Sequence, residues 1–359
     1  MAVRDGREHD GRPVRILESF REPRPTTNPY CALLLGSLPA DAAARTFSWP
    51  AALVGRYDVL HVHWPEVVVN RRNRLRRLGA ALLFVLVLVR CRVTGRAIVR
   101  TGHNVVPHES QSAATRAVLT LCDRWTTWWI RLNDETPTPA GAPATTIPHG
   151  HLRGLYADVP VPPSRPGRLL YFGLVRRYKG VEELLEAFAQ VPDESLTLRV
   201  AGRPSDADTA AAVRAAAAGD PRVALALEHI SDEALAREIG ESELVALTYR
   251  QMHNSSAVLL ALSLGRPVLV PANPVNDALA DEVGARWVVR FEGAVGPQVL
   301  TDALAQVRDL SGRPDLGRRE WEPIGRAHAQ TFRSAAAVAR RGRTAPWRRK
   351  AADGWVAED

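Results

Sequence analysis

The sequence predicts an α/β protein built from two Rossmann-like domains that face each other across a cleft. Strand-like apolar segments alternate with helical segments along the 359 residues, an order typical of βαβ units and a parallel sheet. The stretch DVPVPPSRPG at residues 158–167 interrupts this alternation, because its prolines and glycine exclude a helix or a central strand. The length suits two domains, and 46% apolar residues is enough to build a core in each.

The domain boundaries follow from this interruption and from the composition of the C-terminus. The last residues combine several arginines and Lys350 with glycine and proline, which is typical of a frayed basic tail. The expected organisation is an N-terminal domain at 1–157, a linker at 158–167, a C-terminal domain at 168–335 and a basic, flexible tail at 336–359.

In the N-terminal half, short apolar segments that run into polar loops mark the strands. Tyr57–Pro65 alternates apolar and polar residues and ends at a proline, which describes a strand that feeds a loop. The expected elements are, in order, a strand at Arg15–Glu18, a helix at Tyr30–Leu38, the strand at Tyr57–Pro65, a helix at Arg71–Val89, a strand at Ala97–Arg100, a helix at Gln111–Asn133 and a strand with a loop at Thr146–Gly150.

In the C-terminal half, the same alternation of strands and helices repeats more regularly. Strands are expected at Arg168–Phe172, Leu196–Ala201, Val223–Leu227, Glu243–Leu247, Pro267–Val270 and Arg286–Val289. Helices are expected at Val181–Gln190, Asp206–Ala218, Asp232–Ile239, Ser255–Leu264 and Asn276–Val283. Ser255 and Ser256 are suitable caps for the helix that runs to Leu264.

The basic residues are almost all arginine. Arginine and lysine together number 47 against 39 acidic residues, and Lys179 and Lys350 are the only lysines. A composition rich in alanine and arginine indicates a GC-rich genome, so most of the net charge of +8 carries little functional information. A lysine that persists in such a sequence is a better candidate for a specific role.

The cysteines and the apolar runs indicate a cytoplasmic protein. Cys31, Cys91 and Cys122 fit no metal-ligand spacing, and their odd number favours a reducing compartment. The charged N-terminus lacks the apolar stretch of a signal peptide. The longest apolar run, Leu78–Val89, has twelve residues, whereas a membrane-spanning helix needs about 20.

The loop after the first strand of the C-terminal half has the features of a phosphate site. Gly173 ends the strand, Arg176 and Lys179 follow in the loop, and Gly180 precedes a helix. Ligands bind at the carboxyl ends of strands in open α/β sheets, and a helix N-terminus attracts anions. A compact ammonium such as that of Lys179 suits a phosphate oxygen, so we expect this loop to hold a diphosphate.

Three segments together resemble the nucleotide-binding half of GT-B glycosyltransferases. They are FGLVRRYKGVEELLEAF from residue 172, LRVAGRP from residue 198 and LVALTYRQMHNSSAVLLALSLGRPVLVP from residue 244, and the likeness covers residues 168–271. In this family two Rossmann-like domains close on a nucleotide sugar, generally without a metal. The resemblance implies no metal and no cofactor, and a donor site formed by Gly173, Arg176, Lys179, Asn254, Ser255 and Ser256.

The sequence departs from the family pattern where many retaining members carry two glutamates. Met252 and Leu260 occupy those positions, and Leu174 replaces a common basic residue. The ribose contact stays open between Glu228 and Glu282. The resemblance therefore does not imply retention at the anomeric carbon, and we slightly favour inversion.

Two polar segments of the N-terminal half, HVHWPE from residue 61 and HNVVPHE from residue 103, each follow a strand. Their histidines and carboxylates lack a zinc spacing such as HExxH, so we expect no metal there. The second segment resembles a loop of bacterial polysaccharide glycosyltransferases, which implies that His103 lies beside the transferred sugar. His63 and His108 are expected on the acceptor side.

An inverting transfer needs a general base within hydrogen-bond reach of the acceptor hydroxyl. The candidates are Glu66 first, then His103 and Glu109. Cationic groups or a helix N-terminus must also stabilise the leaving diphosphate, and Arg176, Lys179 and the serine-capped helix suit that task.

The stretch Arg71–Val89 has two interpretations. It is either a core helix of a parallel-sheet domain or a helix at an anionic membrane surface, with its arginines at the headgroups. The second placement would suit an acceptor carried on a polyprenyl lipid.

The expected function is transfer of a hexose from a nucleotide-diphosphate sugar to a saccharide or lipid-linked saccharide in polysaccharide or glycoconjugate biosynthesis. Two alternatives stay open: a sugar-nucleotide epimerase of the same architecture, and a basic protein that binds nucleic acid. No helix-turn-helix, zinc-finger or RNA-stacking motif supports a specific nucleic-acid partner. The donor could carry UDP, GDP or dTDP.

Overall fold

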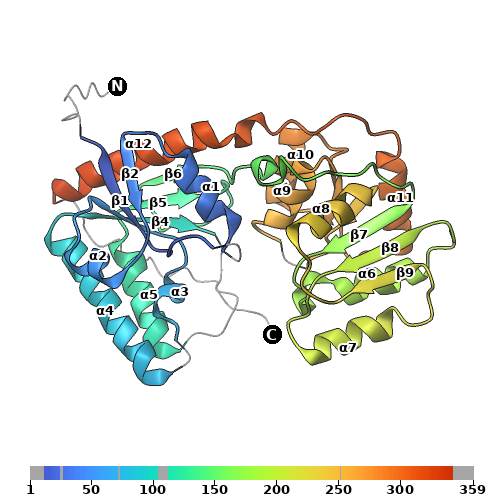
Figure 1. Cartoon of the computed structure of the whole chain (residues 1–359), viewed down its shortest axis with the longest axis horizontal. Coiled ribbons are helices and arrows are strands. Elements are labelled where there is room, and N and C mark those ends of the chain that lie inside the picture. The colour runs from blue at the N-terminus through green and yellow to red at the C-terminus, as the bar shows by residue number, and fades with distance from the viewer. Residues whose placement is uncertain (1–11, 25–26, 72, 104–111, 251, 343–359) are drawn as a thin grey trace. The chain divides into compact units, whose positions relative to one another are not determined.

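The computed structural model describes residues 12–24, 27–71, 73–103, 112–250 and 252–342, which fold into two compact α/β units. The first unit combines Met1–Gly150 with Arg319–Asp359, and the second is His151–Arg318. Each unit contains a six-stranded parallel sheet with helices on its faces (Figure 1). The expected fold class of two Rossmann-like α/β units is confirmed.

The first sheet has the strand order β2-β1-β3-β4-β5-β6. Its strands are β1 (Val14–Glu18), β2 (Ala42–Arg45), β3 (Val59–Val62), β4 (Ala97–Gly102), β5 (Trp128–Arg131) and β6 (Ala144–Thr146). Its helices are α1 (Pro29–Ser37), α2 (Trp49–Val54), α3 (Pro65–Val69), α4 (Arg74–Val93), α5 (Ala113–Trp125) and α12 (Trp321–Arg340). The chain adds β2 on one side of β1 and then β3 on the other, so the sheet reverses its direction of growth between β1 and β3.

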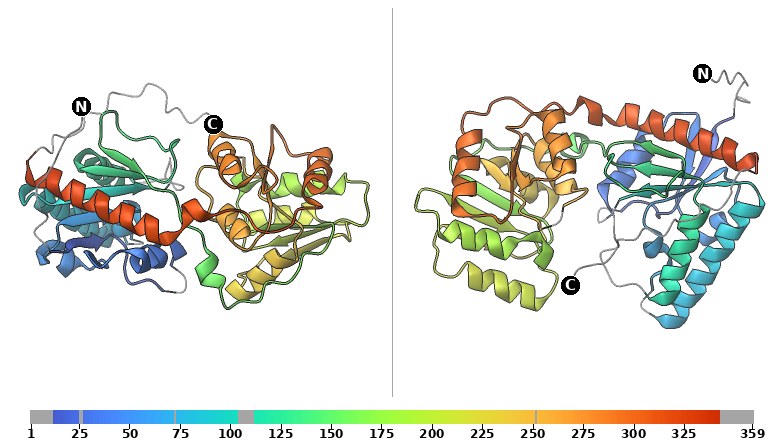
Figure 2. Two further views of the ribbon diagram at one scale, coloured as in Figure 1. Left: turned by 90° about the horizontal axis from the view of Figure 1, so that it is seen from above. Right: turned by 180° about the vertical axis from the view of Figure 1, so that it is seen from behind.

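Both faces of this sheet are covered, because its strands carry apolar side chains on each face. On one face, Leu60 and Ile98 pack with Phe84 and other apolar residues of α2 to α5. On the other face, Ile16 and Val99 belong to a core that α12 completes. Figure 2 shows α12, in red, running along this sheet, and its residues contact β1, β3, β4 and α1.

The second sheet has the order β12-β11-β10-β7-β8-β9. Its strands are β7 (Arg168–Phe172), β8 (Thr197–Ala201), β9 (Val223–Ala226), β10 (Leu244–Ala246), β11 (Val268–Pro271) and β12 (Val288–Phe291). Its helices are α6 (Val181–Ala189), α7 (Ala207–Ala216), α8 (Asp232–Glu241), α9 (Ser256–Ser263), α10 (Pro274–Val283) and α11 (Pro297–Val307), and 3-10 turns lie at η1 (Arg153–Tyr156), η2 (Arg177–Lys179) and η3 (Gly317–Arg319). This sheet reverses between β7 and β10, as in a dinucleotide-binding fold.

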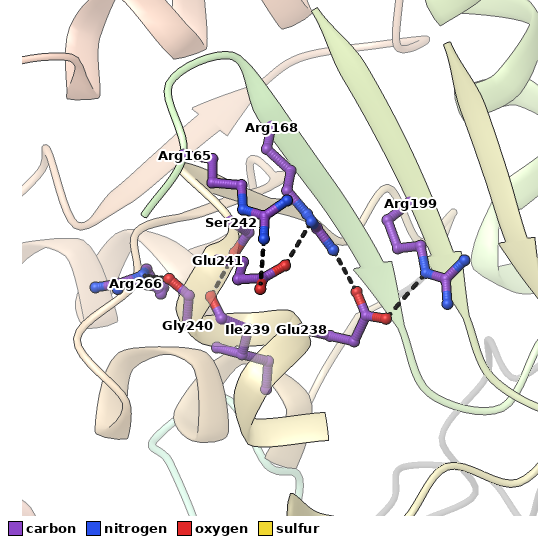
Figure 3. Close-up of polar contacts among 9 residues, drawn as sticks. All are labelled: Arg165, Arg168, Arg199, Glu238, Ile239, Gly240, Glu241, Ser242 and Arg266. Carbon is purple, nitrogen blue, oxygen red and sulfur yellow. Dashed lines mark hydrogen bonds and ion pairs between the residues drawn. The ribbon is translucent and has the colours of Figure 1, made fainter. Parts of the chain in front are cut away.

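A network of ion pairs ties α8 to the starts of β7 and β8 (Figure 3). Arg168 contacts Glu238 and Glu241, each at 2.6 Å, and Arg199 contacts Glu238 at 3.0 Å. Arg266 donates to the carbonyl oxygen of Gly240 at 2.6 Å. Arg168 begins β7 and Arg266 precedes β11, at the end of the sheet opposite to the carboxyl ends of the strands, so these contacts serve the packing of the unit.

The units divide the chain at other residues than the sequence analysis expects. The expected linker at 158–167 packs on the second unit, where Arg165 pairs with Glu241 at 2.9 Å and the Pro162 carbonyl accepts from Arg266 at 2.9 Å. Residues 319–335, expected in the C-terminal domain, belong to the first unit. The reason is α12, whose apolar face completes the core against β1 and β4 and which continues to Arg340, beyond the expected start of the tail at residue 336.

One expected helix is shorter than predicted. The prediction ran from Gln111 to Asn133, but α5 ends at Trp125 and β5 follows. The Thr126 hydroxyl donates to the Cys122 carbonyl at 2.9 Å at this point. The aromatic residues that follow pair with β4 as a strand instead.

No helix among the described residues is both long and apolar enough to cross a membrane. The three cysteines are buried as free thiols.

Candidate functional site

The loop of the second unit that we expect to hold a phosphate depends on two glycines with positive φ. Gly173 ends β7 with φ of +108°, and Gly180 opens α6 with φ of +65°. A Cβ on Gly180 would lie 2.3 Å from the carbonyl oxygen of Thr248. Only glycine therefore permits the backbone to pass this close to the end of β10.

Lys179 is a partly buried cation beside the end of β7. Its Nζ lies 3.1 Å from the Tyr249 hydroxyl and 4.6 Å from the centre of the Tyr249 ring. Burial, followed by the charge of Arg176, lowers the pKa of Lys179 to about 8. No ion pair joins Lys179 to a carboxylate within the described ranges. An anion bound here would supply the missing counter-charge.

Tyr249 connects two of the expected donor residues. Its side chain bonds with Lys179 and with Ser255, and burial raises its pKa. Ser255 is also the N-cap of α9, where its hydroxyl accepts from the Val258 amide at 3.4 Å. Of the neighbouring candidates, Asn254 is half-buried and Ser256 is exposed. Gly173, Arg176, Lys179 and Ser255 thus gather where the second sheet reverses. The sequence analysis did not single out Tyr249, although its position just after β10 could have indicated it.

In the first unit, a buried carboxylate lies where the sheet reverses. Glu18 ends β1 and has no exposed surface. Nδ1 of His61 lies 3.0–3.1 Å from its two carboxylate oxygens, and Nε2 of His63 lies 3.0 Å from Oε2. The other nitrogen of His61 lies 2.8 Å from the Thr101 hydroxyl. Glu18 therefore anchors two histidines from β3 and the turn that follows it.

His103 extends this network after β4. Its Nε2 lies 2.9 Å from Nδ1 of His63. The Trp64 ring stacks on it with ring centres 4.1 Å apart, and Tyr30 meets it edge-on at 5.1 Å. Ring contacts on two sides fix the plane of the His103 imidazole.

Two further histidines lie near this cluster. Nε2 of His328, from α12, lies 3.2 Å from the Tyr30 hydroxyl, and Nδ1 of His328 lies 2.8 Å from the Ile324 carbonyl oxygen. Nδ1 of His149 lies 2.7 Å from the Gly150 carbonyl oxygen. The sequence analysis did not place Glu18, Tyr30 and His328 near these histidines, because they come from β1, α1 and α12.

The pKa shifts in the cluster favour an ionised Glu18 and neutral rings of His63 and His103. Burial alone would raise the pKa of Glu18, but the two bonded histidines outweigh burial and bring it to about 2. Burial and His61 lower the pKa of His63 to about 4. Burial and the neighbouring histidines lower the pKa of His103 well below its ordinary value.

Glu18, His61 and His63 also meet the distance criterion for a metal site. One ligand atom of each lies within 4.8 Å of the others, although the sequence analysis expected no metal. Every one of these atoms is accounted for by a hydrogen bond of 3.0–3.1 Å to its neighbour. We assign the three side chains to a hydrogen-bond network.

Of the other expected catalytic and acceptor-side residues, the structure brings His63 into this cluster. Glu66 lies in the first turn of α3 and is half-buried. His108 and Glu109 lie outside the described residues. His63 is 2% exposed, which places it behind His103.

Comparison with known proteins identifies the family. The sequence model described as "Glycosyl transferases group 1" matches residues 166–308. A GDP-mannose:glycolipid 4-beta-D-mannosyltransferase from Xanthomonas campestris pv. campestris is 42% identical over 325 residues, which cover 90% of this chain and 93% of that protein.

Solved glycosyltransferase structures share the fold. AviGT4, a glycosyltransferase involved in avilamycin A biosynthesis, aligns with a TM-score of 0.55 at 16% identity and covers 90% of this chain and 98% of its own. Anabaena HepE in complex with UDP and glucose aligns with a TM-score of 0.55 at 14% identity, covering 92% and 100%.

These findings define a glycosyltransferase of the GT-B fold. The chain belongs to the group 1 glycosyltransferase family. The predicted function, transfer of a hexose from a nucleotide-diphosphate sugar to a saccharide or lipid-linked saccharide, is confirmed at this level.

The neutral buried histidines make the first unit sensitive to acid. In the folded state the pKa of His63 and His149 is about 4 and that of His328 about 3, against 6.5 for an ordinary histidine. Between pH 6.5 and 4 the unfolded chain binds protons that the folded chain does not, so the free energy of unfolding falls as pH falls. Each such histidine contributes up to about 1.4 kcal/mol per pH unit. Glu18 acts in the same direction below pH 4.5.

Urea unfolding at pH 7.5, 6.5 and 5.5, followed by tryptophan fluorescence, measures this slope. Most tryptophans of the described residues belong to the first unit, so the signal reports on that unit. His328→Gln should reduce the slope. A free energy of unfolding that does not change between pH 6.5 and 5.5 would contradict neutral burial of these histidines.

Proposed function

We propose that this protein transfers mannose from GDP-mannose to a glycolipid with inversion at the anomeric carbon. The observation that carries the proposal is 42% identity over 90% of the chain to a protein named for that donor and acceptor class. Identity at this level extends through both units, because 325 aligned residues exceed the length of either.

Inversion is supported from two directions. The relative is named for a β-mannosyl product, and GDP-mannose carries its mannose in α linkage, so a single displacement accounts for the change. In this chain Met252 and Leu260 stand where many retaining members carry glutamates. Leu260 is 8% exposed in α9, and Sδ of Met252 lies 3.5 Å from Nδ2 of Asn276.

On the donor side, the second unit supplies positive charge for the leaving diphosphate. Lys179 and Arg176 are the cations, and the N-terminus of α9 behind Ser255 adds oriented amide groups. Fixed cations of this kind stabilise a departing diphosphate without a metal. We therefore propose metal-independent transfer.

A direct assay tests the reaction. Purified protein is incubated with GDP-mannose, UDP-glucose or dTDP-glucose and a lipid-linked saccharide, and product is identified by mass spectrometry and by the anomeric carbon-proton coupling. We expect transfer from GDP-mannose alone, a β-linked product, and unchanged turnover in EDTA. An α-linked product would refute inversion, and loss of activity in EDTA that a divalent ion restores would refute metal independence.

Removal of the Lys179 charge should weaken donor binding. Lys179→Met keeps the aliphatic stem and loses one charge-assisted contact, which predicts about a 10- to 100-fold weaker affinity for GDP. Arg177→Met is the matched control, because Arg177 is an exposed cation of the same turn. Titration calorimetry with GDP measures both. Equal affinity of Lys179→Met and the parent would exclude Lys179 from the donor site.

We also propose that α4 holds the protein at an anionic membrane surface, where a glycolipid acceptor resides. One face of α4 is core, with Phe84, Val87 and Leu88 fully buried. Along the opposite face runs a stripe of exposed apolar side chains at helical spacing: Leu75, Leu78, Leu82, Leu86, Val89 and Val93, which are 37–79% exposed. One face of α4 thus fits the core-helix interpretation, and the other face supports the proposed contact with a membrane surface.

The charges around the stripe suit anionic headgroups. Arg74 and Arg76 are exposed and Arg77 half-buried at the start of the helix. Arg90, by contrast, donates to the carbonyls of Ala52 and Gly55 at 2.8 and 2.5 Å and serves the fold. An amphipathic helix with a basic rim lies in the interface plane of a membrane.

Charge reversal on α4 should release the protein from vesicles. Arg74, Arg76 and Arg77 are replaced together by Glu, and binding is measured by co-sedimentation with phosphatidylglycerol-containing vesicles. Near an anionic surface each arginine contributes about 1 kcal/mol, so binding should fall by at least about tenfold. The control reverses exposed Arg214, Arg237 and Arg308 of the second unit, which changes the net charge equally. Equal losses in the two variants would indicate nonspecific attraction.

A further inference from the structure

Glu18, His63 and His103 form a chain of buried hydrogen bonds that the donor chemistry does not use. Nε2 of His63 lies 3.0 Å from Oε2 of Glu18, and Nδ1 of His63 lies 2.9 Å from Nε2 of His103. The exposed fraction rises along the chain from 0% to 2% to 8%. Glu18 is therefore the inner end and His103 the outer end.

The hydrogen bonds assign the proton positions. Ionised Glu18 only accepts, so His63 donates from Nε2. Neutral His63 then accepts at Nδ1, which requires His103 to donate from Nε2. His103 consequently carries no proton on Nδ1, and this nitrogen is the basic one.

Neighbouring contacts hold this arrangement in place. Nδ1 of His61 donates to the same carboxylate, and Nε2 of His61 lies 2.8 Å from the Thr101 hydroxyl. The His63 amide donates to the Ser19 hydroxyl oxygen at 3.0 Å. The carboxylate is thus bonded on both sides, and rotation of His63 would break its bond to Glu18.

We propose that Nδ1 of His103 is the general base of the transfer and that Glu18, acting through His63, positions it and stabilises its charged form. This inference rests on the proposed inverting mannosyl transfer. The acceptor hydroxyl oxygen bonds to the anomeric carbon and its proton passes to Nδ1 of His103. The bond from that carbon to the diphosphate oxygen breaks, and its electron pair leaves with GDP.

The surroundings explain why His103 needs a carboxylate behind it. The titratable groups that face it are Tyr30 from α1, His61 and His63 from β3 and its turn, His149 from the segment after β6, and His328 from α12, and Glu18 from β1 lies behind His63. Glu18, with a pKa lowered to about 2, supplies a negative charge to this cluster near neutral pH. Since the imidazolium forms only as the proton transfers, this support raises kcat and leaves substrate affinity unchanged.

Steady-state kinetics of five variants tests the assignment: His103→Gln, His63→Gln, Glu18→Gln, Glu18→Asp and, as a matched control, His328→Gln. His328 is as buried as the others but bonds to Tyr30 and Ile324 instead. His103→Gln should lower kcat on the order of 10²- to 10⁴-fold. Glu18→Gln should lower kcat by up to about 10⁴-fold, and Glu18→Asp, which keeps the charge, should regain at least about tenfold of that loss.

The KM values and GDP affinity should stay within about threefold of the parent in all five variants, because the relay acts in the transition state. His328→Gln should keep kcat near that of the parent. Equal kcat for Glu18→Gln and Glu18→Asp would overturn the relay. A loss of kcat confined to Glu66→Gln, with His103→Gln active, would assign the base to Glu66.

Nitrogen NMR of ¹⁵N-histidine-labelled parent protein gives a readout that needs no variant with a damaged core. The His103 signals, identified by their absence in His103→Gln, should show a protonated Nε2 and an unprotonated Nδ1. Protonation of Nδ1 instead would refute the proposal. Absence of mannosyl transfer by the parent would count against the proposed function alone, and the relay variants are then assayed with the nucleotide sugar that the parent transfers.

Discussion

The reversal of strand order in each sheet is the constraint on which both candidate sites depend. In the first sheet the chain grows from β1 to β2 and then resumes on the other side with β3, and in the second it does the same around β7 with β8 and β10. At such a reversal, the chain leaves two adjacent strands toward opposite faces of the sheet. No connecting segment then crosses over the carboxyl ends of these two strands, and a crevice remains there. Glu18 with His63 occupies this position in one unit, and Gly173 with Tyr249 occupies it in the other.

The side chains at the two strand reversals carry opposite charges. The proposed donor side presents cations: Lys179 contacts the hydroxyl and ring of Tyr249, and its charge would pair with a bound anion. The first unit buries the Glu18 anion behind His63, whose low pKa keeps its ring neutral in the folded state. A buried network of this kind is stable only when every polar atom is satisfied, and here both ends of the carboxylate and both nitrogens of His63 have partners.

Local sequence indicated which residues come together in the second unit but not in the first. The proximity of Gly173, Arg176 and Lys179 could be predicted because the glycines, cations and following helix lie within ten residues of sequence. Glu18 and His61 are 43 residues apart, and Tyr30 and His328 are 298 apart, so no local pattern could join them. The return of α12 to the first unit escaped prediction for the same reason: its apolar face indicates a helix but does not say which sheet it covers. The sequence analysis attributed most arginines to the composition of a GC-rich genome, yet Arg168 and Arg266 each bind specific partners where strands begin.

The position of α4 relates the membrane surface to the histidine network within one unit. Its buried face packs on the sheet beside β4, and His103 follows directly after β4. The helix that would hold the lipid surface and the nitrogen that would accept the proton are therefore placed by the same strand. A lipid-linked acceptor cannot leave its bilayer, so its reacting hydroxyl must be reached from a surface fixed relative to the base. In the proposed transfer, packing α4 and His103 on a common sheet would satisfy that requirement within the first unit, and the second unit would bind and release the soluble nucleotide.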